Sequence, residues 1–323
     1  MCAVAAPAHA ADATTLTLYS AQHHQMVNLL IQDFTKQTGI KVRVHSGEAP
    51  EIANQISQEG ARSPADVYFT ENSPELTLLD ENGLLAKIDA KTLARVPAKY
   101  SASDGNWVGV LARENVLAFN PAMIKESALP ASLMDLAKPA WRGKIAIAPS
   151  DADFLPLVQA VVALKGKPAA LTWLKGLKTN AQVFDDDEGV VAAVDRGAVA
   201  TGIINNYYWA RLRTEKGSAN THSRIHHFSN GDIGALINVS GAAVLKSSKH
   251  PKEAQRFVAF LVSEPIQKML GKGDIDFEYP LARGVAPNPL LKPFAQLQPP
   301  HVSMAQLGDD QLAAQLLRQA GLI

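Results

Sequence analysis

The feature that most constrains the fold is the alternation of strand-like and helix-like patterns between residues 16 and 83. Three segments predict strands, because their apolar residues alternate or run together over short stretches: 16–19, 40–45 and 65–70. The segments that follow these strands show helical periodicity and end in glycines. They predict helices over about 24–37 and 47–60, and a third helix that follows residue 70 and ends near residue 83. Alternating strands and helices with short connections favour a mostly parallel sheet with helices on both faces.

The second half of the chain repeats this pattern. Strands are predicted over 141–148, 182–184 and 200–204, with helices over about 154–165, 170–176 and 187–197. A long strand over 234–240 and a helix over about 250–270 follow. Two α/β units joined by long strands predict a hinged, two-lobe clamshell with a cleft between the lobes.

The lobe boundaries follow from where the long strands lie. The expected N-terminal lobe combines 13–109 with 234–284, and the C-terminal lobe combines 110–233 with 285–323. The hinge strands are expected near 108–112 and 234–240. Ligands of both lobes would then meet in the cleft.

Composition excludes several classes of protein. Lysine plus arginine and aspartate plus glutamate each number 31, and both signs are mixed along the chain, so neither nucleic acid nor an anionic membrane is an expected partner. No run of about 18 apolar residues occurs, so no membrane span is predicted.

Residues 1–10 differ from the rest of the chain. They are rich in small residues and end in Ala8-His9-Ala10, a pattern typical of a secretory cleavage site. We interpret them as the residual end of a signal peptide, the alternative being an alanine-rich N-terminal tail. Cys2, the single cysteine, lies inside this segment. A mature chain without thiols suits the periplasm.

Two consecutive tyrosines, Tyr207 and Tyr208, follow the apolar strand that ends at Ile204. Asn205 or Asn206 is a suitable N-cap for the helix that starts there. A phenol has a pKa near 10, so holding a phenolate at neutral pH costs about 4 kcal/mol, which a bound metal ion could supply. The alternative is that both rings line or pack a groove.

His23 and Glu71 are predicted to lie at one edge of the first sheet. His23 follows the first strand and Glu71 immediately follows the third. In open α/β sheets, ligands bind outside the carboxyl ends of the strands. Each residue also has an ordinary alternative: a structural histidine and a carboxylate at a helix start.

Five segments together resemble one protein family. The chain resembles the periplasmic ferric-iron-binding proteins, which are solute receptors of bacterial ABC importers, from residue 16 to residue 323. The segments that carry the resemblance are Tyr19-Ser-Ala-Gln-His23, Pro64-Ala-Asp-Val-Tyr-Phe-Thr-Glu71, Trp141-Arg-Gly-Lys-Ile145, Ile204-Asn-Asn-Tyr-Tyr-Trp209 and Ser240-Gly-Ala-Ala-Val-Leu-Lys246.

The resemblance implies a type II periplasmic-binding-protein clamshell that is no enzyme. It implies Fe³⁺ as the transported ligand, bound by His23, Glu71, Tyr207 and Tyr208, and a periplasmic monomer that meets an importer permease. The donor chemistry agrees, since one carboxylate and two phenolates match a trivalent charge and oxygen ligands suit a hard ion.

One part of the family pattern is missing. In many members a phosphate completes the iron shell, but the matching positions here are Asp151, Asp153 and Asp187, whose charges would repel phosphate. We therefore expect no exogenous anion, and water or a carboxylate such as Asp151 in its place. The alternative is that these acids are turn and N-cap residues. Asn72 and Asn205 are expected either at this anion position or in contact with the iron ligands from outside the shell.

Two other functions stay open on sequence grounds. The same fold could bind an organic cation, another metal or an oxyanion, with Tyr207 and Tyr208 as groove walls. A metalloenzyme could use the ion as a Lewis acid, although no residue is an evident general base. A phenolate-to-iron absorption band would distinguish the ferric receptor from the other receptors.

Overall fold

The computed structural model describes residues 14–273 and 276–323. The predicted residual signal peptide, residues 1–10 with Cys2, lies outside the described residues. Each helix in the described part of the chain is too short or too polar to cross a bilayer.

The strands and helices alternate as the sequence predicts. The strands are β1 Thr15–Ala21, β2 Lys41–Ser46, β3 Val67–Thr70, β4 Leu85–Ala86, β5 Trp107–Phe119, β6 Ile145–Ile147, β7 Ala181–Val183, β8 Thr201–Asn205, β9 Arg224–His226, β10 Ile237–Leu245 and β11 Tyr279–Pro280. The α-helices are α1 His24–Thr38, α2 Ala49–Glu59, α3 Ser73–Glu81, α4 Ala90–Leu93, α5 Phe154–Lys165, α6 Lys167–Asn180, α7 Asp187–Asp195, α8 Asn206–Lys216, α9 Pro251–Leu261, α10 Glu264–Lys272, α11 Met304–Leu307 and α12 Gln311–Ala320.

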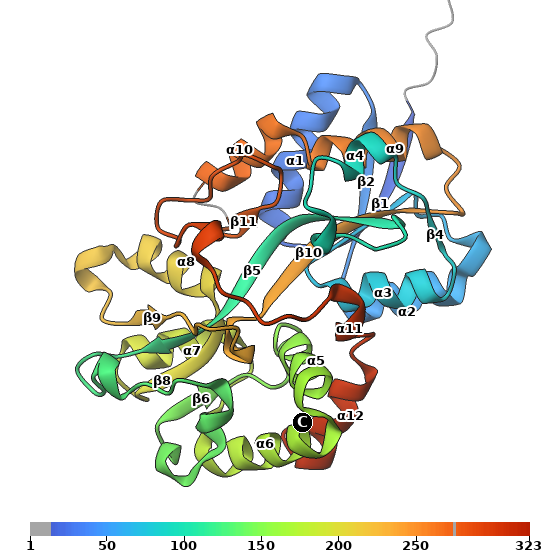
Figure 1. Cartoon of the computed structure of the whole chain (residues 1–323). Helices are drawn as coiled ribbons and strands as arrows, with labels where there is room; N and C mark the ends of the chain where they lie inside the picture. Colours follow the sequence, from blue (N-terminus) through green and yellow to red (C-terminus); the bar gives the residue numbers. More distant parts are fainter. Residues whose placement is uncertain (1–13, 274–275) are drawn as a thin grey trace, which may run out of the picture.

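Two lobes are joined by the long strands β5 and β10 (Figure 1). The strand order is β2-β1-β3-β10-β5-β8-β6-β7. Pairing is parallel within each lobe, between β1 and its neighbours and between β6 and its neighbours, whereas β10 and β5 run antiparallel to the strands beside them. The predicted mixed, mostly parallel α/β architecture is thus confirmed.

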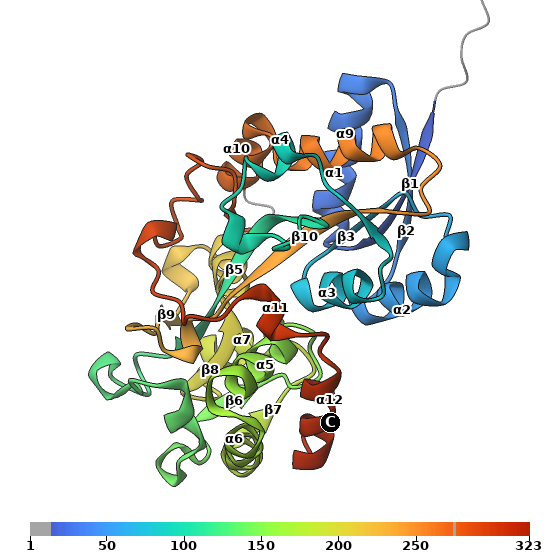
Figure 2. The ribbon, with the colours of Figure 1, turned by 45° about the vertical axis from the view of Figure 1, so that its right-hand side comes forward.

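Helices cover both faces of each sheet. In the upper lobe of Figure 1, α1 and α9 pack together on one face while α2 and α3 pack on the other. In the lower lobe, α5, α6 and α12 pack together, and α7 and α8 contact β8. The turned view in Figure 2 shows α11 between the lobes, where it contacts α3 and α5.

The strand β5 is buried over its whole length, because sheet and helices surround it. Its first half pairs with β10 and its second half pairs with β8 and β9. The register of β10 shifts between Ser240 and Gly241. A Cβ at Gly241 would lie 2.6 Å from Leu76 Cδ1 and 3.1 Å from the Val108 carbonyl oxygen, so a side chain here would crowd the bend.

Three predicted elements are wrong in their bounds. The strand predicted over 141–148 is limited to Ile145–Ile147, because Pro139–Trp141 forms a 3-10 helix before it. The strand predicted over 234–240 begins at Ile237 and continues to Leu245, because the small residues after Ser240 pair rather than turn. The single helix predicted over 250–270 is two helices, α9 and α10. Pro265 lies in the first turn of α10, where its missing N–H costs no helical hydrogen bond.

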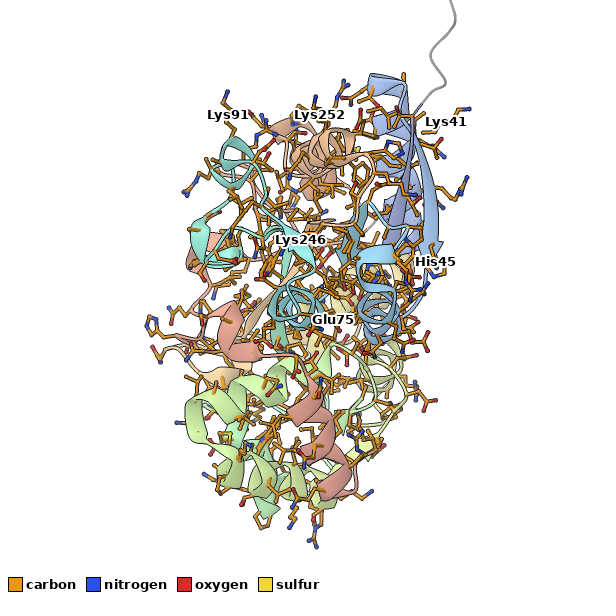
Figure 3. The ribbon with its side chains drawn as sticks, turned by 90° about the vertical axis from the view of Figure 1, so that its right-hand side faces the viewer. Lys41, His45, Glu75, Lys91, Lys246 and Lys252 are labelled. Atoms are coloured by element: carbon orange, nitrogen blue, oxygen red, sulfur yellow. The ribbon has the colours of Figure 1, made fainter. Side chains whose placement is uncertain are left out.

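The outer surface of the upper lobe is polar. Figure 3 shows Lys41, Lys91 and Lys252 projecting into solvent at the end of this lobe. Glu75, on α3, is buried instead and lies near the level where the lobes meet. Burial raises the pKa of Glu75 to about 7.

Candidate metal centre

The two tyrosines stand at the start of α8, directly after β8. Asn206 fixes this helix start to β5, since its Oδ1 accepts the Glu114 N–H at 2.8 Å and its Nδ2 donates to the Phe277 carbonyl at 3.2 Å. The rings of Tyr207 and Tyr208 stack, with centroids 4.1 Å apart. Tyr207 is fully buried and Tyr208 is half-buried. Asn205 is the N-cap residue, but its side chain makes no capping bond.

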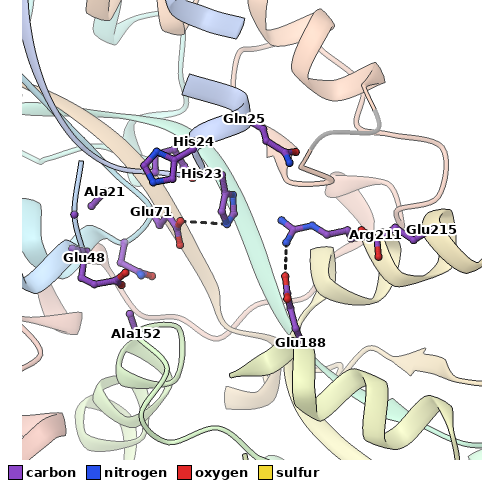
Figure 4. Close-up of a pocket in the computed structure, with 14 residues that line it drawn as sticks. Ala21, His23, His24, Gln25, Glu48, Glu71, Ala152, Glu188, Arg211 and Glu215 are labelled. Atoms are coloured by element: carbon purple, nitrogen blue, oxygen red, sulfur yellow. Dashed lines mark hydrogen bonds and ion pairs between the residues drawn. The ribbon is translucent and has the colours of Figure 1, made fainter. Parts of the chain in front are cut away.

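His23 and Glu71 meet at the carboxyl ends of β1 and β3. The Glu71 N–H donates to the Ala21 carbonyl at 3.2 Å, which holds the two strand ends together. His23 Nε2 lies 3.3 Å from Glu71 Oε1 (Figure 4). The His23 ring meets the Tyr207 ring edge-on, with centroids 5.6 Å apart. His23, Glu71 and the tyrosine pair therefore lie together, although they come from opposite lobes.

The adjacent histidine does not share this arrangement. His24 lines the same cavity as His23, but the ion pair with Glu71 is formed by His23 (Figure 4). The cavity has a volume of about 550 Å³. The other polar side chains along it include Gln22, Glu48, Asn72, Glu188 and Arg211.

Asp276 and Glu278 lie on the other side of His23. Asp276 Oδ1 is 2.6 Å from His23 Nδ1. His23, Asp276 and Glu278 offer ligand atoms within 4.8 Å of one another, so they form a second possible metal group around the same imidazole. Each of these acids also faces a cation: Arg211 lies 3.6 Å from Asp276, and Arg113 lies 2.9 Å from Glu278.

Arg113 extends from the middle of β5 to the Glu71 carbonyl and the Asp153 carboxylate. It is almost fully buried and lies 3.2 Å from Asp153 Oδ1. Its guanidinium also donates to the Glu71 carbonyl and to Asn72 Oδ1. Asn72, in turn, donates to Asp153 at 3.4 Å. Arg113 thus contacts segments of both lobes that carry candidate ligands.

The three acids at the predicted anion position have different contacts. Asp151 accepts the N–H groups of Asp153 and Asp187, at 3.0 and 3.1 Å. Asp187 accepts the Asn205 N–H at 3.0 Å. Asp153 accepts the Tyr207 hydroxyl at 2.8 Å. Two of the acids hold backbone turns together, and the third reaches a tyrosine.

The environment of the candidate ligands shifts their protonation. Burial opposes the cationic form of His23, but Asp276 and Glu71 outweigh it and raise its pKa to about 9. Burial raises the pKa of Glu71 to about 7, against the opposing effect of His23. Burial and nearby carboxylates raise the pKa of Tyr207 and Tyr208 well above the usual value. Without a cation at neutral pH, His23 and both tyrosines therefore favour their protonated forms, and Glu71 is about half protonated.

A cation would reverse this preference. The four candidate donors comprise one carboxyl, two phenols and one imidazole, and an added positive charge beside them favours the deprotonated form of each. Arg211 lies over the Tyr207 and Tyr208 rings, 5.5 and 5.8 Å from their centroids, and it further favours phenolates. The arrangement suits a small hard cation of high charge.

Sequence comparison places the chain in a family. Residues 30–299 match the family described as bacterial extracellular solute-binding protein. The chain belongs to this family. The "Fe(3+)-binding periplasmic protein" of Serratia marcescens is 41% identical to this solute-binding protein over 100% of this chain and 95% of its own length. The "Major ferric iron-binding protein" of Neisseria meningitidis serogroup A is 39% identical over 95% of this chain and 93% of its own length.

Solved structures agree with this placement. The structure of iron-bound HitA from Pseudomonas aeruginosa superimposes on this solute-binding protein with a TM-score of 0.90 and 47% identity, covering 95% of this chain and 99% of its own. A ferric binding protein from Campylobacter jejuni gives a TM-score of 0.87 at 27% identity, over 95% and 99% of the two chains. The predicted type II clamshell is thereby confirmed.

The sequence reasoning missed Arg113, Asp276 and Glu278. Arg113 could have been found, because Arg113-Glu114 interrupts an otherwise apolar strand and a buried charge requires a partner. Asp276 and Glu278 follow a helix in a stretch without periodicity, so the sequence holds no comparable indication of their position in this solute-binding protein.

Proposed function

We propose that this protein captures ferric iron between its two lobes and delivers it to the permease of an ABC importer. The observation that carries the proposal is the meeting of the His23–Glu71 pair with the stacked Tyr207 and Tyr208 rings. The names of the Serratia and Neisseria relatives and the iron-bound Pseudomonas structure support the same cargo.

The proposed ligands are His23, Glu71, Tyr207 and Tyr208. Deprotonated, they supply three negative charges and one neutral nitrogen, which cancels the charge of Fe³⁺ and favours it over divalent ions. Asp276 would hold the His23 ring through Nδ1, leaving Nε2 for the ion, as outer carboxylates do for metal-bound histidines.

The alternative group of His23, Asp276 and Glu278 is less suited to a trivalent ion. Arg113 and Arg211 lie against these two acids. An ion placed there would have to compete with both guanidinium groups for the two carboxylates. The Glu71 and tyrosine side of His23 is therefore the proposed iron position.

Lobe closure would be coupled to iron capture. We propose 13–109 with 234–284 as one lobe and 110–233 with 285–323 as the other, hinged near 108–112 and 234–240. His23 and Glu71 then belong to one lobe and both tyrosines to the other. Iron would stabilise the closed form by its contacts with both lobes, and opening would release it. The packing of α12 on α5 and α6 supports assigning the C-terminal segment to the second lobe.

The cellular setting of the proposal is the periplasm. The Serratia relative is named as a periplasmic protein, and residues 1–10 fit the end of a secretory signal peptide. We propose a monomeric carrier that binds iron reversibly without catalysing a reaction. Its protein partner would be the importer permease, whose docking would coincide with iron release.

Optical titration tests the proposal directly. Purified protein mixed with ferric citrate at neutral pH should become coloured, because phenolate-to-iron charge transfer absorbs visible light. Tyr208→Phe should weaken the band and lower iron affinity. Tyr100→Phe is the matched control, since this buried tyrosine lies in the other lobe, away from the cleft. A wild-type protein that stays colourless and takes up no iron would exclude the proposed function.

A further inference from the structure

Residues 276–278 form a buried connection between the two halves of the proposed iron site. Asp276 Oδ1 lies 2.6 Å from His23 Nδ1. One residue later, the Phe277 carbonyl accepts a hydrogen bond from Asn206 Nδ2 at 3.2 Å. Asn206 is the first residue of α8 and directly precedes the tyrosine pair. The 276–278 segment therefore links the histidine of one proposed lobe to the start of the tyrosine helix in the other.

The backbone of Phe277 adopts an unfavourable conformation. Its φ of 53° lies in the left-handed region, which a bulky residue rarely adopts. Such a conformation persists only where the surrounding contacts determine it. Phe277 itself is 1% exposed, and the flanking carboxylates are both engaged, Asp276 beside His23 and Glu278 at 2.9 Å from Arg113. The segment is therefore constrained at each of its three residues.

The side chain of Asn206 is used for contacts outside its own helix. Its Oδ1 accepts the Glu114 N–H of β5 at 2.8 Å, while its Nδ2 donates to the Phe277 carbonyl. The residue is fully buried. An amide offers one acceptor and one donor group at a fixed separation, whereas an ionised aspartate lacks the donor and alanine lacks both. Asn206 thus sets the distance between β5 and the 276–278 segment.

The other contact between α8 and this segment is longer. Arg211, one turn after Tyr207, lies 3.6 Å from Asp276 Oδ1, which is beyond hydrogen-bond distance. Its guanidinium is also engaged by Glu188 at 2.9 Å (Figure 4). Among the described residues of α8, Asn206 therefore makes the direct hydrogen bond that holds the segment.

We propose that Asn206 is a positioning residue for iron binding that acts through the Phe277 carbonyl. By holding residues 276–278, it fixes Asp276 against the His23 ring and so sets the direction of Nε2. This inference rests on the proposed iron-binding function and goes beyond it, because it assigns a role to a side chain that does not itself bind the ion.

The orientation of the His23 ring matters because Nε2 is the proposed iron-binding atom. Nε2 lies 3.3 Å from Glu71 Oε1, and the ring meets the Tyr207 ring edge-on, with centroids 5.6 Å apart. Outer hydrogen-bond partners fix the ring orientation of metal-bound histidines, and their loss lowers metal affinity about 10–100-fold. Loss of Asn206 should act in the same way, since it frees the backbone that carries Asp276.

Two other roles of Asn206 would have different consequences. A purely structural asparagine would change the stability of the fold and leave iron affinity unaltered. An asparagine that orients the adjacent Tyr207 directly would change iron affinity, but independently of Asp276. Stability, affinity and the coupling between two substitutions therefore separate the three roles.

The first experiment compares Asn206→Ala with Asn180→Ala. Asn180 is a buried asparagine of α6 that donates to the carbonyls of Leu136 and Lys138, away from the residues that line the cleft. Both variants lose buried hydrogen bonds, so both should melt at a lower temperature than wild type. Asn206→Ser serves if Asn206→Ala does not fold.

Iron affinity is measured with ferric nitrilotriacetate at pH 7. It should fall about 10–100-fold in Asn206→Ala and stay at the wild-type level in Asn180→Ala. An unchanged affinity in Asn206→Ala, or an equal loss in both variants, would overturn the inference and leave the proposed function intact. A wild-type protein that takes up no iron would reject the proposed function, and the inference with it.

The second experiment is a double-mutant cycle with Asp276→Asn. This substitution alone should lower iron affinity at least as much as Asn206→Ala does. If Asn206 acts through the 276–278 segment, the double variant should match Asp276→Asn within about twofold. Losses that multiply would mean that Asn206 acts on Tyr207 without the segment, and an Asp276→Asn variant with wild-type affinity would mean that the segment does not orient His23. Either result would overturn the inference.

Discussion

Iron uptake by this protein should release protons in a number fixed by the free site. At pH 7 His23 carries its proton, because its pKa is raised to about 9, and Glu71, with a pKa of about 7, is half protonated. Tyr207 and Tyr208 are both protonated, since their pKa values are raised. Iron needs all four groups deprotonated, so roughly three to four protons should leave per ion.

The sign of the pH effect follows from this count. Because protons compete with iron, lowering the pH weakens binding, and each released proton contributes about a tenfold change in affinity per pH unit. A drop from pH 7 to pH 6 should therefore reduce the affinity by roughly 1,000-fold or more. A site built from groups that are already ionised at pH 7 would instead keep nearly the same iron affinity over this pH range.

Calorimetry in buffers of different ionisation enthalpy measures the protons directly. Ferric nitrilotriacetate is titrated into wild-type protein, His23→Gln and His222→Gln. Protons exchanged by the chelate are the same in all three, so differences between the proteins report the side chains alone. His23→Gln should release about one proton fewer than wild type. His222→Gln, which alters an exposed histidine, should match wild type.

The reasoning is refuted by equal proton release from wild type and His23→Gln. That result would mean that His23 keeps its proton in the loaded protein, which an iron ligand cannot do. A wild-type release near two protons would also contradict the count, since it would leave only the two phenols exchanging protons.

Three further outcomes follow from contacts in and behind the cleft. The iron-free protein should lose up to roughly 3 kcal/mol of unfolding free energy as pH rises from 6.5 through about 9. The raised pKa of His23 stabilises the fold below pH 6.5, and this stabilisation is lost as the pH passes the folded value; urea unfolding at both pH values checks it, and equal stabilities would contradict it. Arg113→Met should cost about 3–5 kcal/mol in the same assay, because it leaves the buried Asp153 without its cation, and a loss below 1 kcal/mol would count against the buried pair. Gly202→Ala should lower stability by about 1–3 kcal/mol, since its Cβ would lie 2.4 Å from Val190 Cγ1, and adding Val190→Ala should restore most of the loss in thermal unfolding if this contact is the cause.

Much of the fold could be predicted because it depends on local periodicity. The strands and helices of the first lobe follow the hydrophobic pattern closely, and the parallel topology then places the residues after β1 and β3 at one edge. That argument brings His23 and Glu71 together without any knowledge of tertiary contacts. The tyrosine pair follows similarly from the β8–α8 junction. Their roles as iron ligands stay predictions until the titrations above are done.

The remaining features depend on contacts between distant parts of the chain. Glu278 lies 165 positions from Arg113, and nothing in its local sequence indicates that it is buried beside a guanidinium. The choice between Asp151 and Asp153 is also hidden, because residues two apart in a turn face different sides only once the turn geometry is fixed. Asp151 binds the turn itself, which leaves Asp153 to reach Tyr207.

The long strand β5 explains why these contacts coincide. Arg113 and Glu114 are consecutive in β5, and in an extended strand their side chains point to opposite faces. Arg113 contacts the Glu71 carbonyl and Asp153, whereas the Glu114 backbone N–H binds Asn206 at the start of the tyrosine helix. Segments of both lobes that carry candidate ligands are therefore attached to one strand. Because Arg113 contacts one lobe through the Glu71 carbonyl and the other through Asp153, its loss would leave buried polar groups of both lobes without their partner. Breaking such a pair is costly, even though an intact buried ion pair adds little net stability.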